Sequence, residues 1–102
     1  MPKSIEPALK ALANDKRLQI LDWLKEPTRN FPPQVDGDLE TDGVCAVFLT
    51  EKLGVSQPAA AQHLKVLVQA GLVTATRKKQ WTFYKRDEAQ IRAVKTLISE
   101  RV

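Results

Sequence analysis

The stretch Leu53–Gly71, LGVSQPAAAQHLKVLVQAG, constrains the fold most, because it carries the start and stop signals of a helix. Ser56 is a good N-cap, since its hydroxyl can accept a hydrogen bond from an unpaired amide of the first turn. Pro58 lies in that first turn, where its missing N–H costs little. Gly71 favours a left-handed C-terminal cap, and Gly54 permits a backbone bend ahead of the helix. A helix, a short turn with glycine and a second helix form a helix-turn-helix.

The residues ahead of this stretch predict two helices and a loop. Residues 4–13 have apolar residues at helical spacing with Ser4 as the cap, and residues 15–26 have a wider apolar surface. Pro27 is predicted to end the second helix. Residues 27–43 contain three prolines, two glycines and four acidic residues, so we expect a loop there.

Helical spacing also predicts the two helices of the motif itself. Residues 44–53 form the first, with Thr41 or Asp42 as the cap. Its inward residues are Val44, Val47, Phe48 and Leu53. Residues 57–70 form the second, which directs one face inward and leaves the other to solvent. Its inward residues are Ala60, Leu64, Leu67 and Val68, and its outward residues are Gln57, Ala61, Gln62 and Lys65.

The rest of the chain predicts a β-hairpin and a last helix. Residues 72–77 are rich in β-branched side chains, and residues 81–86 alternate with the period of a strand. Residues 87–99 form a helix capped by Asp87, with Gln90 as the partner in a variant of the capping box. Because its apolar face has little left to cover in so small a domain, we expect the first and last helices to offer a dimer surface.

Composition favours one soluble globular domain. The chain has 102 residues, of which 43% are hydrophobic and 27% charged. No apolar run approaches the ~20 residues that span a membrane. The N-terminal residues lack the core of a signal peptide, and the single cysteine fits a reducing compartment. We therefore expect a cytoplasmic protein with no membrane partner.

The net charge of +4 is unevenly distributed. Residues 36–54 carry five acidic residues and one basic residue, whereas residues 55–102 carry nine basic and three acidic residues. A basic part beside an acidic segment predicts one face that binds a polyanion and another that does not.

Two stretches of the chain resemble the ArsR/SmtB repressors. One is LGVSQPAAAQHLKVLVQAGLV followed by RKKQWTFYKR, and the other is the leading ALKALANDKRLQILDWL. The resemblance covers nearly the whole chain except residues 27–43, which look like an insertion. It implies a winged helix-turn-helix of about five helices, in which residues 1–102 form one DNA-binding domain, with the helix-turn-helix at 44–71 and the wing at 72–86.

The same resemblance implies the partners. It implies a homodimer joined through the terminal helices, which binds a palindromic operator in double-stranded DNA and is released when an inducer binds.

Base contacts are expected at the start of the second helix of the motif. The predicted DNA-binding residues there are Ser56, Gln57, Ala60, Ala61, Gln62, His63 and Lys65. The glutamine amides suit adenine, which a glutamine side chain can bind through two hydrogen bonds. Ala60 and Ala61 offer only apolar contact, such as to a thymine methyl, and the family often has a serine at Ala61. The alternative is a winged helix used for protein contacts.

The hairpin adds cationic residues to this surface. We expect Arg77, Lys78 and Lys79, with Lys85 and Arg86 nearby, to reach backbone phosphates or the minor groove. The hairpin aromatics Trp81, Phe83 and Tyr84 are expected to anchor the hairpin rather than to stack on bases. The alternative for the basic residues is an ordinary solvated turn. The wing also lacks the glycine that family wings often carry at the tip.

Cys45 and His63 are the other candidates for specific chemistry. Many relatives bind thiophilic metals through a Cys-x-Cys pair, in which Cys45 matches the first position and Val47 the second. We therefore interpret Cys45 as a small buried residue, with a redox role through another chain as the alternative. His63 is expected either to contact DNA phosphate or to be a plain surface residue, because no second histidine shares a metal site.

The acidic residues of the loop form a partial calcium-loop pattern. Asp36, Asp38, Glu40 and Asp42 alternate, and Gly43 is the sixth residue from Asp38. The twelfth is Leu49 rather than glutamate, so a solvated loop is the better interpretation. Its negative charge is expected to keep the loop off the DNA.

No pattern supports catalysis or a cofactor. The chain lacks a pair of residues for nucleophile and base, and it lacks a glycine-rich phosphate loop. We therefore expect a DNA-binding transcriptional regulator that acts as a dimeric repressor. The two alternatives are a redox-responsive repressor acting through Cys45 and a protein-interaction module that retains the fold.

Overall fold

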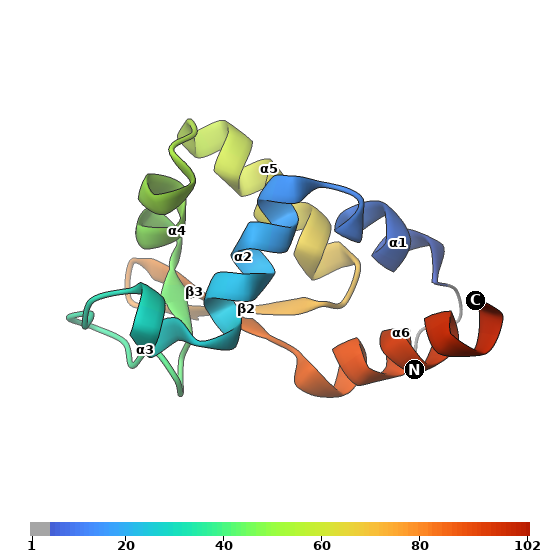
Figure 1. Ribbon diagram of the computed structural model, residues 1–102. Helices are drawn as coiled ribbons and strands as arrows, with labels where there is room; N and C mark the ends of the chain where they lie inside the picture. The colour runs from blue at the N-terminus through green and yellow to red at the C-terminus, as the bar shows by residue number, and fades with distance from the viewer. Residues whose placement is uncertain (1–4) are drawn as a thin grey trace.

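The computed structural model describes residues 5–102 and has a winged helix-turn-helix architecture. Within these residues the chain forms six helices and three strands (Figure 1). The elements in chain order are α1 (Glu6–Leu12), α2 (Asp15–Lys25), α3 (Pro27–Asn30), β1 (Val44–Cys45), α4 (Ala46–Leu53), α5 (Gln57–Gln69), β2 (Val73–Lys78), β3 (Trp81–Arg86) and α6 (Glu88–Arg101). Across residues 5–102, every helix is too short or too polar to cross a membrane.

The predicted caps of α5 are confirmed. The Ser56 hydroxyl accepts a hydrogen bond from the Ala59 amide at 3.2 Å. At the other end, Gly71 has a φ of +78°. Its amide donates to the Val68 carbonyl, and the Leu72 amide donates to the Leu67 carbonyl. This pair of hydrogen bonds is a Schellman motif, which satisfies carbonyls that would otherwise lack a partner at the helix end.

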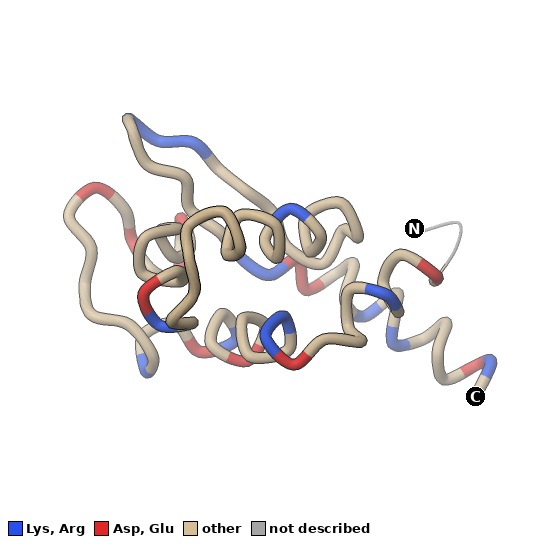
Figure 2. The backbone as a smooth tube through the Cα atoms, turned by 90° about the horizontal axis from the view of Figure 1, so that it is seen from above, with Lys and Arg blue, Asp and Glu red and all other residues tan. Residues whose placement is uncertain are grey.

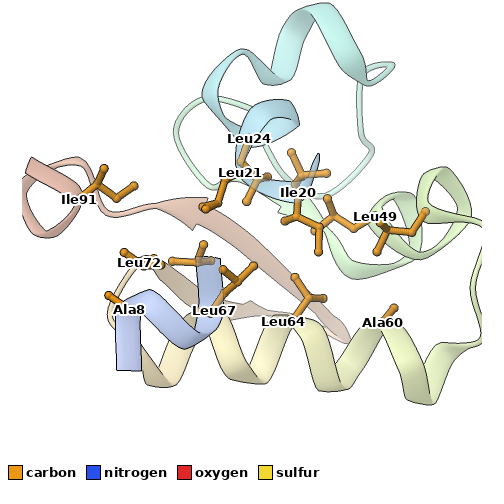
Figure 3. Close-up of a cluster of buried hydrophobic side chains, with 14 of the residues drawn as sticks. Ala8, Ile20, Leu21, Leu24, Leu49, Ala60, Leu64, Leu67, Leu72 and Ile91 are labelled. Atoms are coloured by element: carbon orange, nitrogen blue, oxygen red, sulfur yellow. The ribbon is translucent and has the colours of Figure 1, made fainter. Parts of the chain in front are cut away.

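The core forms where α5 meets α2 and α4. On α5, the side chains of Ala60, Leu64 and Leu67 are buried, as predicted. Val68, the fourth residue predicted to face inward, is half-buried beside them. Figure 3 shows these side chains facing those of α2 and α4 across one apolar layer. The buried residues of this layer include Ala60, Leu64 and Leu67 of α5, Ile20, Leu21 and Leu24 of α2, and Leu49 of α4.

The β-sheet has the strand order β1-β3-β2 and is antiparallel throughout. The predicted hairpin is confirmed, with Val73 opposite Arg86 and Lys78 opposite Trp81. The prediction that Val44 begins a helix is wrong. Val44 pairs with Tyr84 in β1, and the chain approaches β3 so closely at Gly43 that a Cβ there would lie 2.3 Å from the Tyr84 carbonyl oxygen.

This short strand delays the start of α4 and changes which residues face the core. Cys45 is the N-cap residue, so the predicted caps Thr41 and Asp42 are wrong. With the helix beginning at Ala46, the buried residues on α4 are Leu49 and Leu53, which are four apart. Val47, predicted to point inward, is instead 38% exposed.

The ends of α3, α6 and α1 can also be compared with the predictions. Pro27 begins α3, within the segment predicted to be a loop, because proline is tolerated in the first turn of a helix. Asp87 caps α6 by accepting from the Gln90 amide at 3.1 Å, as predicted. Its own amide donates to the Leu72 carbonyl, which ties the start of α6 to the turn that follows α5. The N-cap of α1 is Ile5, and the predicted cap Ser4 lies outside the described residues.

The terminal helices form one end of the molecule. Figure 1 shows α1 and α6 together at this end, away from α3 and α4. Ile91 and Val94 of α6 are buried, whereas Leu97 and Ile98 are only half-buried. Leu9 of α1 and Leu18 of α2 are exposed. Apolar surface therefore remains uncovered on these helices in the single chain.

The close approach of Gly43 to β3 predicts a large loss of stability on substitution. Gly43→Ala introduces a side chain at a φ of +106° and against the Tyr84 carbonyl, so we expect the free energy of unfolding to fall by at least about 2 kcal/mol. Gly54→Ala is the matched control, because its φ is +68° but no atom lies within 4 Å of the added Cβ. Urea unfolding should show the smaller loss for Gly54→Ala, and equal losses would contradict this account.

Candidate nucleic-acid interface

The exposed face of α5 carries four of the seven DNA-binding residues predicted at this helix. Gln57, Ala61, Gln62 and Lys65 are all exposed, whereas the opposite face of the helix lies in the core. The structure therefore places two amide side chains and one ammonium on one surface. Ser56 is exposed at the start of the helix, but its hydroxyl oxygen already accepts the capping hydrogen bond.

Ala60 does not belong to this surface. It was predicted both to face inward and to contact bases, and the structure shows that it is 1% exposed. A methyl group buried against the core cannot reach a thymine, so the prediction of a base contact is wrong. The apolar contribution of this face is therefore limited to Ala61.

His63 is held by an arginine from α2. Its Nδ1 lies 3.2 Å from the Arg17 Nη1. Because a guanidinium only donates, Nδ1 accepts and the neutral ring carries its proton on Nε2. Partial burial lowers the pKa of His63 below its usual value of 6.5, and the positive charges of Arg17 and Lys16 lower it further. His63 is therefore neutral at physiological pH and contributes no positive charge to a DNA interface.

The contact with His63 is one of several that Arg17 makes. Its Nε donates to the Ala11 carbonyl at 2.7 Å, and its Nη2 donates to the Lys10 carbonyl at 3.1 Å. One guanidinium therefore joins the end of α1, the start of α2 and the middle of α5. No local pattern predicts this role, since Arg17 and His63 are 46 residues apart.

The wing presents its basic residues at the β2–β3 turn. Lys79 has a φ of +57°, the left-handed conformation that a glycine often takes in a tight turn. The Arg77 Nε donates to the Lys79 carbonyl at 3.3 Å, which closes the turn. Arg77 and Lys85 are exposed, and neither has an ion-pair partner within residues 5–102.

The other two lysines of the wing are paired with the acidic loop. Figure 2 shows the basic end of the hairpin and the acidic loop on the same side of the molecule. The Lys79 Nζ lies 3.0 Å from an Asp36 oxygen, and the Lys78 Nζ lies 3.4 Å from an Asp42 oxygen. The Trp81 Nε1 donates to the second Asp36 oxygen at 2.8 Å. Trp81 thus anchors the hairpin to the loop, a contact that the sequence did not predict.

The acidic side chains are occupied by donors of the protein. Asp38 accepts hydrogen bonds from the amides of Glu40 and Thr41 and from the Thr41 hydroxyl, and Asp42 accepts from the Asp38 amide. Those donors lower the pKa of both carboxyls. Across residues 5–102, no group of three acidic, histidine or cysteine side chains is arranged to hold a metal ion.

Arg86 is a structural residue rather than part of the DNA-facing surface. Its side chain is only 10% exposed. The Nη1 donates to the Leu21 carbonyl at 3.1 Å, and the Nε lies 2.8 Å from a Glu88 carboxylate oxygen. The prediction that Arg86 reaches phosphates is wrong, because the guanidinium joins α2, β3 and the first turn of α6.

Cys45 is buried, as predicted. Its amide donates to the Gln34 side-chain oxygen at 2.6 Å, and the Gln34 amide group donates to the Gly43 carbonyl at 3.0 Å. Gln34 thereby satisfies backbone groups on both sides of Val44. The arrangement accounts for Cys45 as a packed residue at the start of α4, and a redox role stays a prediction.

The environment of His63 predicts a pH effect on folding. Because its pKa is lower in the folded than in the unfolded chain, the unfolded state binds more protons below pH 6.5. We therefore expect the free energy of unfolding to decrease as the pH falls from about 7.5 to about 5. His63 is the only histidine, so its ring signals in a proton NMR titration report the shift directly. A folded-state midpoint at or above 6.5 would contradict the assignment.

Comparisons with known proteins agree with this architecture. Residues 45–75 match the family described as bacterial regulatory protein, arsR family. The chain is 51% identical over 82 residues to the HTH-type transcriptional regulator YbzH of Bacillus subtilis. The matched region covers 80% of this chain and 82% of that protein. It is 29% identical over 100 residues to the arsenical resistance operon repressor of Bacillus subtilis, covering 98% of this chain and 79% of that protein.

A solved structure gives the same result. HlyU from Vibrio cholerae superposes with a TM-score of 0.60 and 31% identity, covering 95% of this chain and 94% of that chain. The paired helices, the wing and these matches together show that the chain belongs to the ArsR family of bacterial regulatory proteins, which are DNA-binding transcriptional regulators and not enzymes.

Proposed function

We propose that this chain is a homodimeric repressor that inserts α5 into the major groove of a palindromic operator. The observation that carries the proposal is the two-sided character of α5. One side is buried in the core, while Gln57, Gln62 and Lys65 are exposed on the other side. A rigid helix with exposed amides beside a basic hairpin matches the requirements for reading base edges and binding phosphates.

The proposed readout divides between the two parts of this surface. The amides of Gln57 and Gln62 are suited to adenine in the major groove, and Ala61 can contact a thymine methyl. The side chains of Lys65 and Arg77 are exposed cations that can approach phosphates. With two copies related by a twofold axis, the half-sites would be separated by about one helical turn of DNA or a multiple of it.

The proposed dimer uses the end of the molecule formed by α1 and α6. Leu9 and Leu18 expose apolar surface there, and the half-buried Ile98 lies along a groove with Leu12 and Leu18. Burying this surface against a second copy would add to the small core of a 102-residue chain.

The inducer is proposed not to be a thiophilic metal held by the Cys-x-Cys pair of the family. The chain has one cysteine, and Val47 occupies the second position of that pair. Cys45 is buried with its backbone amide bound to Gln34, so a single thiol would have to supply the site. A redox signal through Cys45, which needs no second ligand in the same chain, stays the alternative for release of the proposed repressor.

Substitution of a single glutamine tests the proposed readout. We expect Gln62→Ala to weaken operator binding by about 1–3 kcal/mol per half-site, because the amide hydrogen bonds to one base are lost. Affinity for random duplex DNA should change little, since phosphate contacts supply non-specific binding. Competition binding against both DNAs measures the difference.

Gln69→Ala is the matched control for this test. Gln69 is also exposed on α5, but it lies at the C-terminal end, whereas the first turns of a recognition helix enter the groove. The proposal requires a larger operator-specific loss for Gln62→Ala than for Gln69→Ala. Equal losses on operator and random DNA for Gln62→Ala would remove this residue from sequence readout.

A charged residue at the terminal helices tests the proposed dimer. We expect Leu18→Lys to shift the chain toward a monomer and to weaken operator binding, because the ammonium cannot be buried without a partner. Val47→Lys is the control, since Val47 is similarly exposed but lies on α4. Analytical ultracentrifugation reports the mass. A monomer for the unsubstituted chain at micromolar concentration, or a Leu18→Lys dimer of unchanged stability, would rule out this surface.

A further inference from the structure

The tip of the wing is already occupied by negative charge from the same chain. Asp36 uses both carboxylate oxygens, one for the Lys79 ammonium at 3.0 Å and the other for the Trp81 indole N–H at 2.8 Å. Asp42 lies 3.4 Å from the Lys78 ammonium. Both lysines therefore have an intramolecular anion within ion-pair distance.

The carboxylates are held in place by contacts that do not involve the lysines. The Asp38 amide donates to Asp42 at 2.8 Å, and Asp38 itself closes the turn by accepting from the Thr41 amide and hydroxyl. Gly37 packs on the ring of Phe83 so closely that an added Cβ would lie 2.5 Å from a ring carbon. A carboxylate fixed beside its lysine has a high effective concentration compared with any anion in solution.

The ion pairs remain exchangeable. The side chains of Lys78 and Lys79 are 49% and 67% exposed, and exposed ion pairs are weak because water and salt screen them. Hydrogen bonds from Lys79 and Trp81 lower the pKa of Asp36, so its carboxyl stays ionised near neutral pH. A phosphate can thus displace each carboxylate, but it must first compete with the carboxylate for the same ammonium group.

These contacts separate the wing cations into two groups. Arg77 has no ion-pair partner within residues 5–102, whereas each of the two lysines must leave a carboxylate before it can bind a phosphate. We propose that the acidic loop, residues 36–42, competes with DNA phosphates for the tip of the wing, so that Asp36 and Asp42 limit the affinity and the salt dependence of DNA binding. This inference rests on the proposed function, because it requires the wing to contact DNA.

Replacing both carboxylates by amides tests the competition. Asp36→Asn with Asp42→Asn keeps an oxygen to accept from Trp81 and from the Asp38 amide, so the loop should retain its turn. We expect about threefold to tenfold tighter binding to duplex DNA at low salt, because two ammonium groups become free. The slope of log affinity against log salt should steepen by up to about 2, since each phosphate contact contributes about 0.9.

The matched control removes two negative charges from residues that do not pair with the wing lysines. Glu40 lies in the same loop and Glu51 on α4, both are exposed, and neither forms an ion pair in the described part of the chain. Glu40→Gln with Glu51→Gln should give less than half of the gain in affinity and a nearly unchanged slope. A gain as large as that of the Asp36/Asp42 variant would overturn the proposal in favour of a general effect of net charge.

A variant without the two lysines tests whether the gain in affinity depends on them. With Lys78→Ala and Lys79→Ala present, the two asparagine substitutions should no longer increase affinity, because no paired ammonium remains to be released. Without DNA, acetic anhydride should modify Lys78 and Lys79 faster in the asparagine variant than in the unsubstituted chain. Lys65, exposed and without an ion pair in the described residues, is the internal reference for this reaction.

The outcomes separate this inference from the proposed function. If the unsubstituted chain binds no duplex DNA, the proposed function fails and the competition fails with it. If it binds DNA and the asparagine variant shows the same affinity and slope, only the competition is overturned. A gain that persists in the lysine-to-alanine background would also overturn it.

Discussion

The burial of one face of α5 is the constraint on which the rest of this structure depends. Its inward residues Ala60, Leu64 and Leu67 lie against α2 and α4, and the helix also contacts α1 and β2. This packing fixes the rotation of the helix about its own axis, because only one face is apolar enough to be buried. The same rotation determines which side chains remain exposed, and it directs Gln57 and Gln62 outward.

Polar contacts then fix the parts of the molecule that the core does not reach. Arg17 joins α1, α2 and α5, and Arg86 joins α2, β3 and α6. The wing projects beyond the core, so it is positioned by Asp36, which binds both Trp81 and Lys79. The arrangement has a cost for function, since the contact that orients the wing also occupies one of the cations that would bind DNA.

Much of the fold follows from local signals in the sequence. The caps of α5, the start of α2 at Asp15 and the hairpin all depend on residues that are close together along the chain. The errors around β1 have a common origin in a contact between distant residues. Val44 pairs with Tyr84 rather than beginning a helix, and that pairing shifts the start of α4 and turns Val47 outward. No local pattern distinguishes an edge strand of two residues from the first turn of a helix.

For the candidate site, the sequence by itself determined the chemistry: a capped helix with outward glutamines, a basic hairpin, a single cysteine and an acidic segment. The tertiary structure decided which of those residues are available. It buried Ala60, tied His63 to Arg17, used Arg86 inside the fold and placed Asp36 and Asp42 against the wing lysines. The physical reason is that charge and hydrogen bonding act through space, and pairs 36 to 65 residues apart meet only once the core has brought their elements together.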